Sequence, residues 1–362
     1  MPQTPAALPA PDFDPRRRAL LLSALAAAPA LALPGWARAS LLAGSDKLPV
    51  TLDFDWVDSK RQRAVPARLH WPAEAGGPAS NVPLVVFSHG IGGSRMGYSY
   101  LGRHLASLGW ACLHVQHVGS DRSLWFNGSV WGVVSRLRAA AQESEAIERV
   151  RDLRFALDTL LDPALQHDEV GRPGERIDPQ RIVAAGHSYG ANTTMLAIGA
   201  RVARANQVHD FLDPRLRAAI LISAPPFYGE TDLAGILAPV KLPTLHVTTN
   251  EDVINIPGYH SGVEDRIAVF DAMPDVRKTL VVFDRGNHSI FTDRQVSGGP
   301  ELNQQIKGAT KTLAAAFLSQ QFGADTAALG AWRESWKTIV ARSAGAGWAE
   351  PAPAPAAPAT SA

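Results

Sequence analysis

The chain has 362 residues, 46% of them hydrophobic and 19% charged, and its 35 Lys and Arg almost balance its 34 Asp and Glu. This composition is typical of a globular protein and argues against wholesale disorder, a collagen-like repeat and a polytopic membrane protein. A net charge of +1 produces no field that would hold nucleic acid, so we expect no nucleic-acid partner. The single cysteine, Cys112, excludes an internal disulfide and a cysteine-based zinc site.

The first 39 residues have the features of an export signal. Three arginines, 16–18, precede an uncharged run, 19–33, which is shorter than the roughly 20 residues that span a bilayer as a helix. The small-residue sequence Ala37-Arg38-Ala39 then offers a cleavage site. Adjacent arginines before an apolar run resemble a twin-arginine signal; a Sec-type signal and an uncleaved anchor helix are the alternatives. We therefore predict an exported protein, periplasmic or extracellular.

The C-terminal end has a different composition from the rest of the chain. Ala and Pro occupy 11 of the 14 positions 349–362, and such a segment has too little apolar surface to form a core. We predict three parts: an export signal at 1–39, one folded α/β domain at 40–343, and a disordered tail at 344–362.

Within the predicted domain, strand patterns alternate with helix patterns. Extended segments are predicted at 50–56, 63–71, 83–88, 110–116, 181–186, 218–223, 243–248 and 279–283. Helices are predicted at 98–108, 144–161, 191–204, 303–320 and 331–341. The later strands are continuous apolar runs, which predicts a mostly parallel, doubly wound sheet with helices on both faces. A ligand site is then expected beyond the carboxyl ends of the strands.

The segment Gly186-His187-Ser188-Tyr189-Gly190 follows an apolar strand pattern and precedes a helix pattern. This is the G-x-S-x-G arrangement in which a sharp strand-to-helix turn exposes the serine hydroxyl. The two glycines permit a tight turn and close packing of helix on strand. We therefore predict Ser188 as a nucleophile, against the alternative of a serine in an ordinary glycine-lined turn.

A second glycine-rich turn follows the predicted strand at 83–88. Residues 88–93 read Ser-His-Gly-Ile-Gly-Gly, and acyl transfer needs backbone N–H groups aimed at the oxygen that acquires charge. We predict the amides of Ile91 and Tyr189 as this oxyanion hole, with His89 bracing the loop. A plain strand-to-helix turn is the alternative.

The residues at 87–99, followed by Leu-Ala-Ser-Leu-Gly-Trp at 105–110, resemble the platelet-activating-factor acetylhydrolase group of α/β-hydrolases, to which dienelactone-hydrolase-like proteins are related. Residues 149–158 resemble the helix that precedes the nucleophile strand in that group. The resemblance extends over about residues 82–291. It implies an α/β-hydrolase fold, a serine nucleophile and metal-free hydrolysis of esters, often with short acyl chains, and it assigns the same roles to Ser188 and Ile91.

The general base must be a histidine that follows Ser188, because the order in this fold is serine, acid, histidine. His288 lies in a glycine-containing loop after the last predicted strand, at the carboxyl edge where a base can reach the serine. His260 is the alternative. His246 lies inside an apolar strand and His209 in a polar segment, so neither is favoured.

The acid is predicted from the end of another strand. The acetylhydrolase group carries an aspartate just after the strand that follows the nucleophile helix, whereas this chain has no carboxylate at 221–226. The next strand ends at Asn250-Glu251-Asp252, the other usual position for the acid in this fold. We predict Asp252, with Glu251, Asp284 and Asp232 as alternatives in that order.

Segment 119–136 is an aromatic insertion that we expect to form a small roof over the site. Trp125, Phe126 and Trp131 are its candidate substrate-binding residues, and a hydrophobic cluster under a long loop is the alternative. The histidines lack H-E-x-x-H or a comparable spacing, so we expect neither a metal nor a cofactor.

These features together predict an exported serine hydrolase of carboxylic esters with short acyl chains, acting through Ser188, His288 and Asp252. The same machinery could act on lipids, polyesters or amides, and a catalytically silent α/β-hydrolase used for binding, or retained as an envelope scaffold, is the remaining alternative. The expected partners are a small-molecule or lipid ester and water, with transient contact to a membrane or hydrophobic ester surface.

Overall fold

The computed structural model describes residues 48–73, 81–126, 132–204, 207–256, 259–294, 298–323 and 325–348. The predicted export signal, the candidate Trp131 and most of the predicted tail lie outside these ranges. No helix in the described part of the chain combines the length and apolar character that a bilayer span requires.

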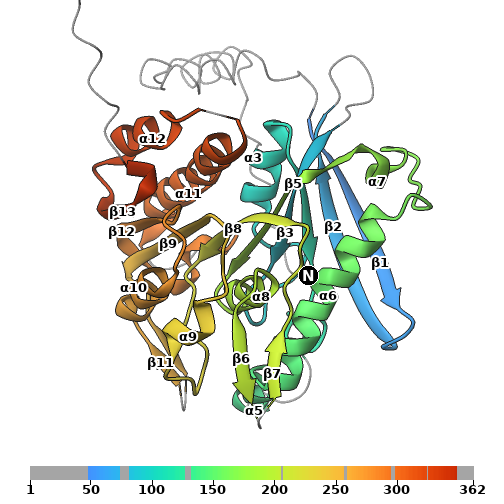
Figure 1. Ribbon diagram of the computed structural model, residues 1–362, viewed down its shortest axis with the longest axis horizontal. Coiled ribbons are helices and arrows are strands. Elements are labelled where there is room, and N and C mark those ends of the chain that lie inside the picture. Colours follow the sequence, from blue (N-terminus) through green and yellow to red (C-terminus); the bar gives the residue numbers. More distant parts are fainter. Residues whose placement is uncertain are drawn as a thin grey trace, which may run out of the picture.

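One large sheet forms the centre of the molecule (Figure 1), with the strand order β1-β2-β4-β3-β5-β8-β9-β12-β13. Its strands are β1 (Val50–Asp58), β2 (Arg63–Trp71), β3 (Val82–Ser88), β4 (Ala111–Val115), β5 (Ile177–His187), β8 (Leu216–Ile222), β9 (Thr244–Glu251), β12 (Thr279–Asn287) and β13 (Val340–Gly345). The strands from β4 to β12 pair in parallel, while β1 and β2 at one edge and β13 at the other are antiparallel. The predicted, mostly parallel sheet is thus present.

Helices cover both faces of this sheet. One face packs against α3 (Ser99–Ser107), α11 (Gly299–Phe322) and α12 (Ala328–Trp336). The other face packs against α6 (Glu143–Leu161), α8 (Tyr189–Ala197), α9 (Leu233–Leu237) and α10 (Val263–Ala272). Side chains of β3 alternate between the two cores, with Leu84 and Val86 in one and Val85 and Phe87 in the other, as a strand covered on both sides requires.

The remaining elements are short and lie around the sheet. They are α4 (Ser123–Phe126), α5 (Val133–Ala140), α7 (Pro173–Arg176), the hairpin of β6 (Arg201–Arg204) and β7 (Gln207–Asp210), the hairpin of β10 (Ile254–Ile256) and β11 (Tyr259–Ser261), and the 3₁₀ turns η3 (His288–Phe291) and η4 (Ala346–Trp348). The predicted roof segment supplies α4 and the beginning of α5.

Two predicted helices are too long at their C-terminal ends. The helix predicted at 191–204 ends at Ala197, because Gly199 takes a φ of 112° that a helix cannot continue, and 201–204 become β6. The helix predicted at 331–341 ends at Trp336, and Val340 begins β13 instead.

The folded part also continues past residue 343, where the tail was predicted to begin. Strand β13 pairs with β12 as far as Gly345, opposite Thr279. The Trp348 ring then lies 6.1 Å from that of Trp332 and donates its N–H to the Ala344 carbonyl at 3.0 Å. Backbone pairing and the packing of an indole therefore order residues 344–348, which composition alone assigned to the tail.

Candidate active site

Ser188 lies at the turn between β5 and α8. Its backbone has φ 56° and ψ −122°, a region that costs a residue with a Cβ about 1–3 kcal/mol and persists only where the surroundings impose it. A Cβ at Gly190 would overlap the carbonyl oxygen of Ser88, and one at Gly186 would overlap that of Gly190. The glycines are needed here for close approach, and the resulting turn presents the serine at the carboxyl edge of the sheet.

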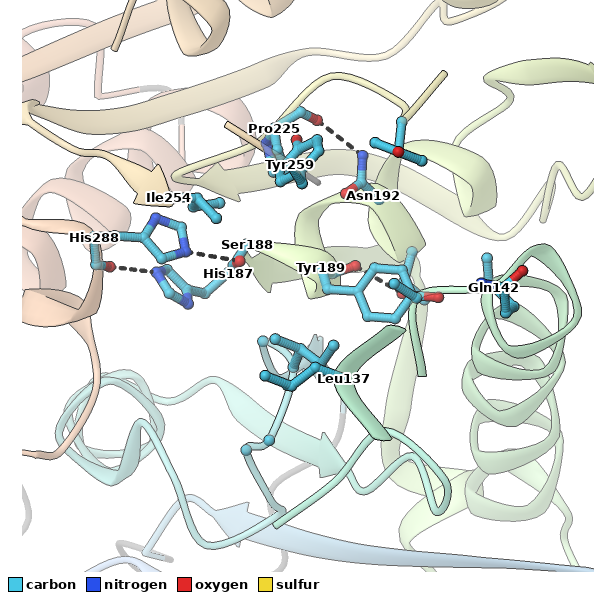
Figure 2. Close-up of a pocket in the computed structure, with 18 of the residues that line it drawn as sticks. Leu137, Gln142, His187, Ser188, Tyr189, Asn192, Pro225, Ile254, Tyr259 and His288 are labelled. Atoms are coloured by element: carbon cyan, nitrogen blue, oxygen red, sulfur yellow. Dashed lines mark hydrogen bonds between the residues drawn. The ribbon is translucent and has the colours of Figure 1, made fainter. Parts of the chain in front are cut away.

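Three side chains from three strand ends form one hydrogen-bonded row. Ser188 Oγ lies 2.8 Å from His288 Nε2 (Figure 2). His288 Nδ1 lies 2.6 Å from Oδ1 of Asp252. Asp252 directly follows β9, and His288 directly follows β12. A neutral imidazole with its proton on Nδ1 donates to the carboxylate and leaves Nε2 to accept from the serine hydroxyl. This arrangement can activate the hydroxyl as a nucleophile.

The carboxylate of Asp252 is fully buried and has further partners. Thr248 donates its hydroxyl to Oδ2 at 2.7 Å, and an Nη of Arg266 lies 3.5 Å from Oδ1. Burial alone would raise the pKa of Asp252, but the hydrogen bond from His288 and the charges of His288 and Arg266 outweigh it and hold that pKa well below its usual value. Asp252 is therefore ionised throughout the neutral range.

The alternative acids lie elsewhere. Glu251 is exposed and accepts the Gly286 N–H at 3.0 Å, Asp284 is exposed, and Asp232 caps α9 by accepting the Gly235 N–H at 2.8 Å. The structure therefore brings Asp252, and none of these three, to His288.

The alternative histidines are also separated from Ser188. His260 is exposed on β11, and His246 is buried in β9 with Nε2 3.1 Å from the Thr244 hydroxyl. His209 Nε2 lies 2.9 Å from Oε1 of Glu143.

The loop after β3 is held by bonds on both sides of Ile91. Gly92 donates to the Ser120 carbonyl at 2.8 Å, and the Gly90 carbonyl accepts the Gly93 N–H at 3.0 Å. His89 donates from Nδ1 to the Gly90 carbonyl at 2.7 Å and accepts the His117 N–H at Nε2 at 3.1 Å, so His89 braces the loop as predicted.

Two backbone N–H groups remain for a ligand beside the serine. Within the described residues, the amides of Ile91 and Tyr189 donate to no other group, and both residues line the same cavity as Ser188. Their positions, one in the loop and one at the first residue of α8, are those at which donors to an oxyanion are needed.

His187, which no sequence pattern marks, links the loop after β3 to His288. The Gly90 N–H donates to Tyr98 Oη at 3.3 Å, Tyr98 donates to His187 Nδ1 at 2.9 Å, and His187 Nε2 donates to the His288 carbonyl at 2.9 Å. Burial, together with the nearby charge of His288, lowers the pKa of His187 to about 3, so it stays neutral and can donate and accept at once. Nothing local in the sequence marks this network, because His187 is 89 residues from Tyr98 and 101 residues from His288.

A cavity of about 1120 Å³ opens above the serine. Leu137, Ile254 and Tyr259 lie around the Ser188–His288 pair in Figure 2. Trp125 and Phe126 of the predicted roof also line it, whereas Trp131 lies outside the described residues.

The predicted roof is attached to the loop after β3 through Trp125. Its indole N–H donates to the Gly92 carbonyl at 2.9 Å, and a Cβ at Gly92 would overlap the indole ring. Phe126 is instead 72% exposed at the entrance. Among the described residues no group of three or more His, Cys, Asp or Glu side chains is arranged to hold a metal ion.

Comparisons with known proteins give three matches. A family model described as platelet-activating factor acetylhydrolase, isoform II, matches residues 59–131. A platelet-activating factor acetylhydrolase from the dog (Canis lupus familiaris) is 26% identical over 162 residues, which are 37% of this chain and 35% of that protein. A ferulic acid esterase from Streptomyces cinnamoneus has a similar structure, with a TM-score of 0.55 and 20% identity over 77% of this chain and 92% of that one.

The first two matches confirm the resemblance to the acetylhydrolase group that residues 87–110 and 149–158 indicate. The aligned region spans about a third of the length of the curated relative. The structural match, together with the parallel sheet covered on both faces, confirms the predicted α/β-hydrolase fold.

Proposed function

We propose that this protein is a serine hydrolase of carboxylic esters. The observation that carries the proposal is the hydrogen-bonded row of Ser188, His288 and Asp252, whose serine and histidine line a large cavity together with two backbone N–H groups that bind no other group in the described part of the chain. The similarity to an acetylhydrolase family and the fold shared with an esterase support the same reaction class.

In the proposed reaction Ser188 Oγ attacks the ester carbonyl while His288 Nε2 takes the hydroxyl proton. The amides of Ile91 and Tyr189 hold the oxyanion of the tetrahedral intermediate, and Asp252 stabilises the imidazolium. His288 then gives its proton to the leaving alcohol, and an acyl-enzyme remains on Ser188. Water, deprotonated by His288, attacks the acyl carbon and restores the free serine.

The proposal is tested with p-nitrophenyl acetate, butyrate, octanoate and palmitate. The protein without its signal is compared with Ser188→Ala, and hydrolysis is expected to be lost in the variant. If wild type and Ser188→Ala hydrolyse every ester at the same rate, the serine mechanism is wrong. A catalytically silent binding module would then explain the structure better.

The acyl preference follows from the same series. The resemblance to the acetylhydrolase group implies short acyl chains, so activity is proposed to fall from acetate to palmitate. The cavity of about 1120 Å³ is far larger than an acetyl group needs, which favours a second candidate, a hydrolase of bulky or aromatic esters. A rate that rises toward octanoate or palmitate, or higher kcat/KM on a hydroxycinnamoyl ester, would select this candidate.

We expect the entrance of the cavity to make transient contact with an apolar ester surface or a membrane. Trp125 is 38% exposed and Phe126 72%, so both present aromatic surface beside the opening. Co-sedimentation with vesicles of phosphatidylcholine and phosphatidylglycerol, compared between wild type and Phe126→Ser, tests this contact. Equal partition of both proteins would contradict it.

Export is proposed on the sequence of residues 1–39, with cleavage after Ala39. Replacing Arg16 and Arg17 together by lysine is expected to retain the precursor in the cytoplasm of a bacterial host, because the twin-arginine pathway requires the pair. N-terminal sequencing of the exported form should begin at Ser40. Normal export of the lysine variant would indicate a Sec-type signal.

A further inference from the structure

A buried arginine that takes no part in the proposed reaction lies directly behind the oxyanion hole. Arg149 of α6 has no exposed surface, and it does not line the cavity. A buried guanidinium costs several kcal/mol unless its N–H groups are paired, so its partners show what the position is used for.

The guanidinium of Arg149 joins three separate elements. Nε donates to the Thr193 hydroxyl of α8 at 2.9 Å, and one Nη donates to the Ser120 hydroxyl after β4 at 2.8 Å. The other Nη donates to the carbonyl of His89 in the loop after β3. The same group also lies 4.4 Å from the centre of the Tyr189 ring, a cation–π contact.

Two of these contacts lie on either side of Ile91. His89 precedes it by two residues, and its carbonyl is held directly by Arg149. Gly92 follows it, and its N–H is held by the carbonyl of Ser120, the residue whose hydroxyl Arg149 also holds. The remaining contacts, with Thr193 and the Tyr189 ring, fix the start of α8, where the second amide lies.

We infer that Arg149 is the positioning residue of the oxyanion hole: one guanidinium fixes both flanks of Ile91 and the first turn of α8, and so sets the distance between the two N–H donors. This inference deepens the proposed function and rests on it. A donor pair stabilises an oxyanion only if both amides point to one place, because preorganisation removes the cost of moving dipoles during the reaction. Burial lowers the pKa of Arg149 to about 10, so it remains charged at neutral pH.

The test compares Arg149→Lys with Arg154→Met, a control on the same helix whose exposed guanidinium contacts the Leu212 carbonyl at 3.0 Å. Active sites are titrated with an organophosphate that phosphorylates the serine, so that rates are given per folded site. Affinity for a trifluoromethyl ketone is measured as well: Ser188 Oγ bonds its carbonyl carbon, the carbonyl oxygen becomes the oxyanion, and the proton moves to His288.

In Arg149→Lys we expect kcat per site to fall about 10- to 100-fold with KM changed less than about threefold, since the amides act on the transition state. The inhibition constant of the ketone should rise by a similar factor, and amide hydrogen exchange should accelerate in segment 88–95. Arg154→Met should change none of these. A lower melting temperature with unchanged kcat per site and unchanged ketone affinity would overturn the inference, because a merely structural arginine gives that result.

Milder variants keep the test decisive if Arg149→Lys does not fold. Ser120→Ala and Thr193→Val each remove one partner of the guanidinium, and each should weaken ketone binding by about three- to tenfold. Unchanged affinity in both would contradict the inference. If wild type shows no Ser188-dependent hydrolysis, the proposed function fails separately, and hydrogen exchange in segment 88–95 still decides whether Arg149 positions the loop.

Discussion

Asp252 and Glu251 are adjacent carboxylates with opposite surroundings. Asp252 is buried and bonded to His288 and Thr248, whereas Glu251 is exposed and accepts one backbone N–H, that of Gly286. The difference arises because side chains at consecutive positions leave the end of β9 in opposite directions. The pair therefore provides an internal control for the role of the acid.

We expect Asp252→Asn to lower kcat about 10³- to 10⁴-fold, because an amide there disfavours the imidazole tautomer that can accept the serine proton. In Glu251→Gln, kcat should stay within about threefold of the wild-type value, since the contact of this side chain with the backbone can persist. Both are measured as steady-state rates on p-nitrophenyl butyrate, with circular dichroism to verify folding. A larger loss of kcat in Glu251→Gln than in Asp252→Asn would assign the role of the acid to Glu251.

The fall of activity at low pH provides a second test of His288 and Asp252. His288 must be neutral to accept a proton, whereas the hydrogen bond from His288 and the neighbouring charges hold the pKa of Asp252 low, so that carboxylate stays ionised in acid. Log kcat/KM should therefore fall with a limiting slope of one as the pH is lowered from neutral, because a single protonation, that of the base, removes activity. A slope approaching two would contradict this assignment, because it would require a second protonation.

Ser188, His288 and Asp252 could be proposed from the sequence because each follows a strand pattern at a position that the fold uses for chemistry. Arg149, Tyr98 and His187 could not, because most of their partners lie 29 to 101 residues away and only the tertiary structure brings them together. A buried polar side chain looks the same in sequence as a solvated one. The sequence therefore did not reveal the supporting network, although it did reveal the proposed catalytic residues.

At the scale of elements, apolar runs located the strands of the parallel sheet but gave helix ends poorly. Gly199 ends α8 through its positive φ, and an isolated glycine in a helical pattern does not reveal which conformation it takes. The hairpin of β6 and β7 and the edge strand β13 were missed for a related reason. Both are short, partly exposed strands, whose stability comes from pairing with a neighbour rather than from their own pattern.

The roof illustrates how one short element can act on another. Trp125 of α4 covers Gly92 and bonds its carbonyl, one residue after the proposed donor Ile91, whereas the neighbouring Phe126 points to solvent. The two aromatic residues are therefore expected to have separable roles.

Trp125→Ala should lower kcat/KM on p-nitrophenyl butyrate by about tenfold, which corresponds to about 1.4 kcal/mol, the size of one lost hydrogen bond with its packing. Phe126→Ala should leave kcat/KM on this soluble ester within about twofold of the wild-type value. Rates on both variants, normalised to titrated active sites, provide the measurement. Equal losses of kcat/KM in the two variants would show that the roof acts as a general apolar surface and not through the loop after β3.

For the whole molecule, the two edges of the sheet are closed in different ways. At one edge β1 and β2 form a long hairpin, while at the other β13 alone covers β12, the strand that leads to His288. An uncovered β12 would expose unpaired backbone groups, which destabilises a sheet and invites aggregation. The C-terminal residues through Trp348 therefore belong to the structural framework of the site.

This can be tested with two chains that begin at Ser40 and end at Ser343 or Trp348. Loss of residues 344–348 removes the pairing of Gly345 with Thr279, the bond from the Ala346 N–H to the Lys278 carbonyl at 3.1 Å, and the contact between the rings of Trp348 and Trp332. We expect the free energy of unfolding to fall by about 3 kcal/mol, mainly from the lost indole, with a correspondingly lower urea midpoint.

The chain that ends at Trp348 should have the same urea midpoint as one that retains residues 349–362, because that Ala- and Pro-rich segment has little apolar surface to bury. Trp348→Ala in the longer chain should reproduce most of the loss; equal midpoints for the two shorter chains would place the boundary of the fold at 343, as composition alone predicted.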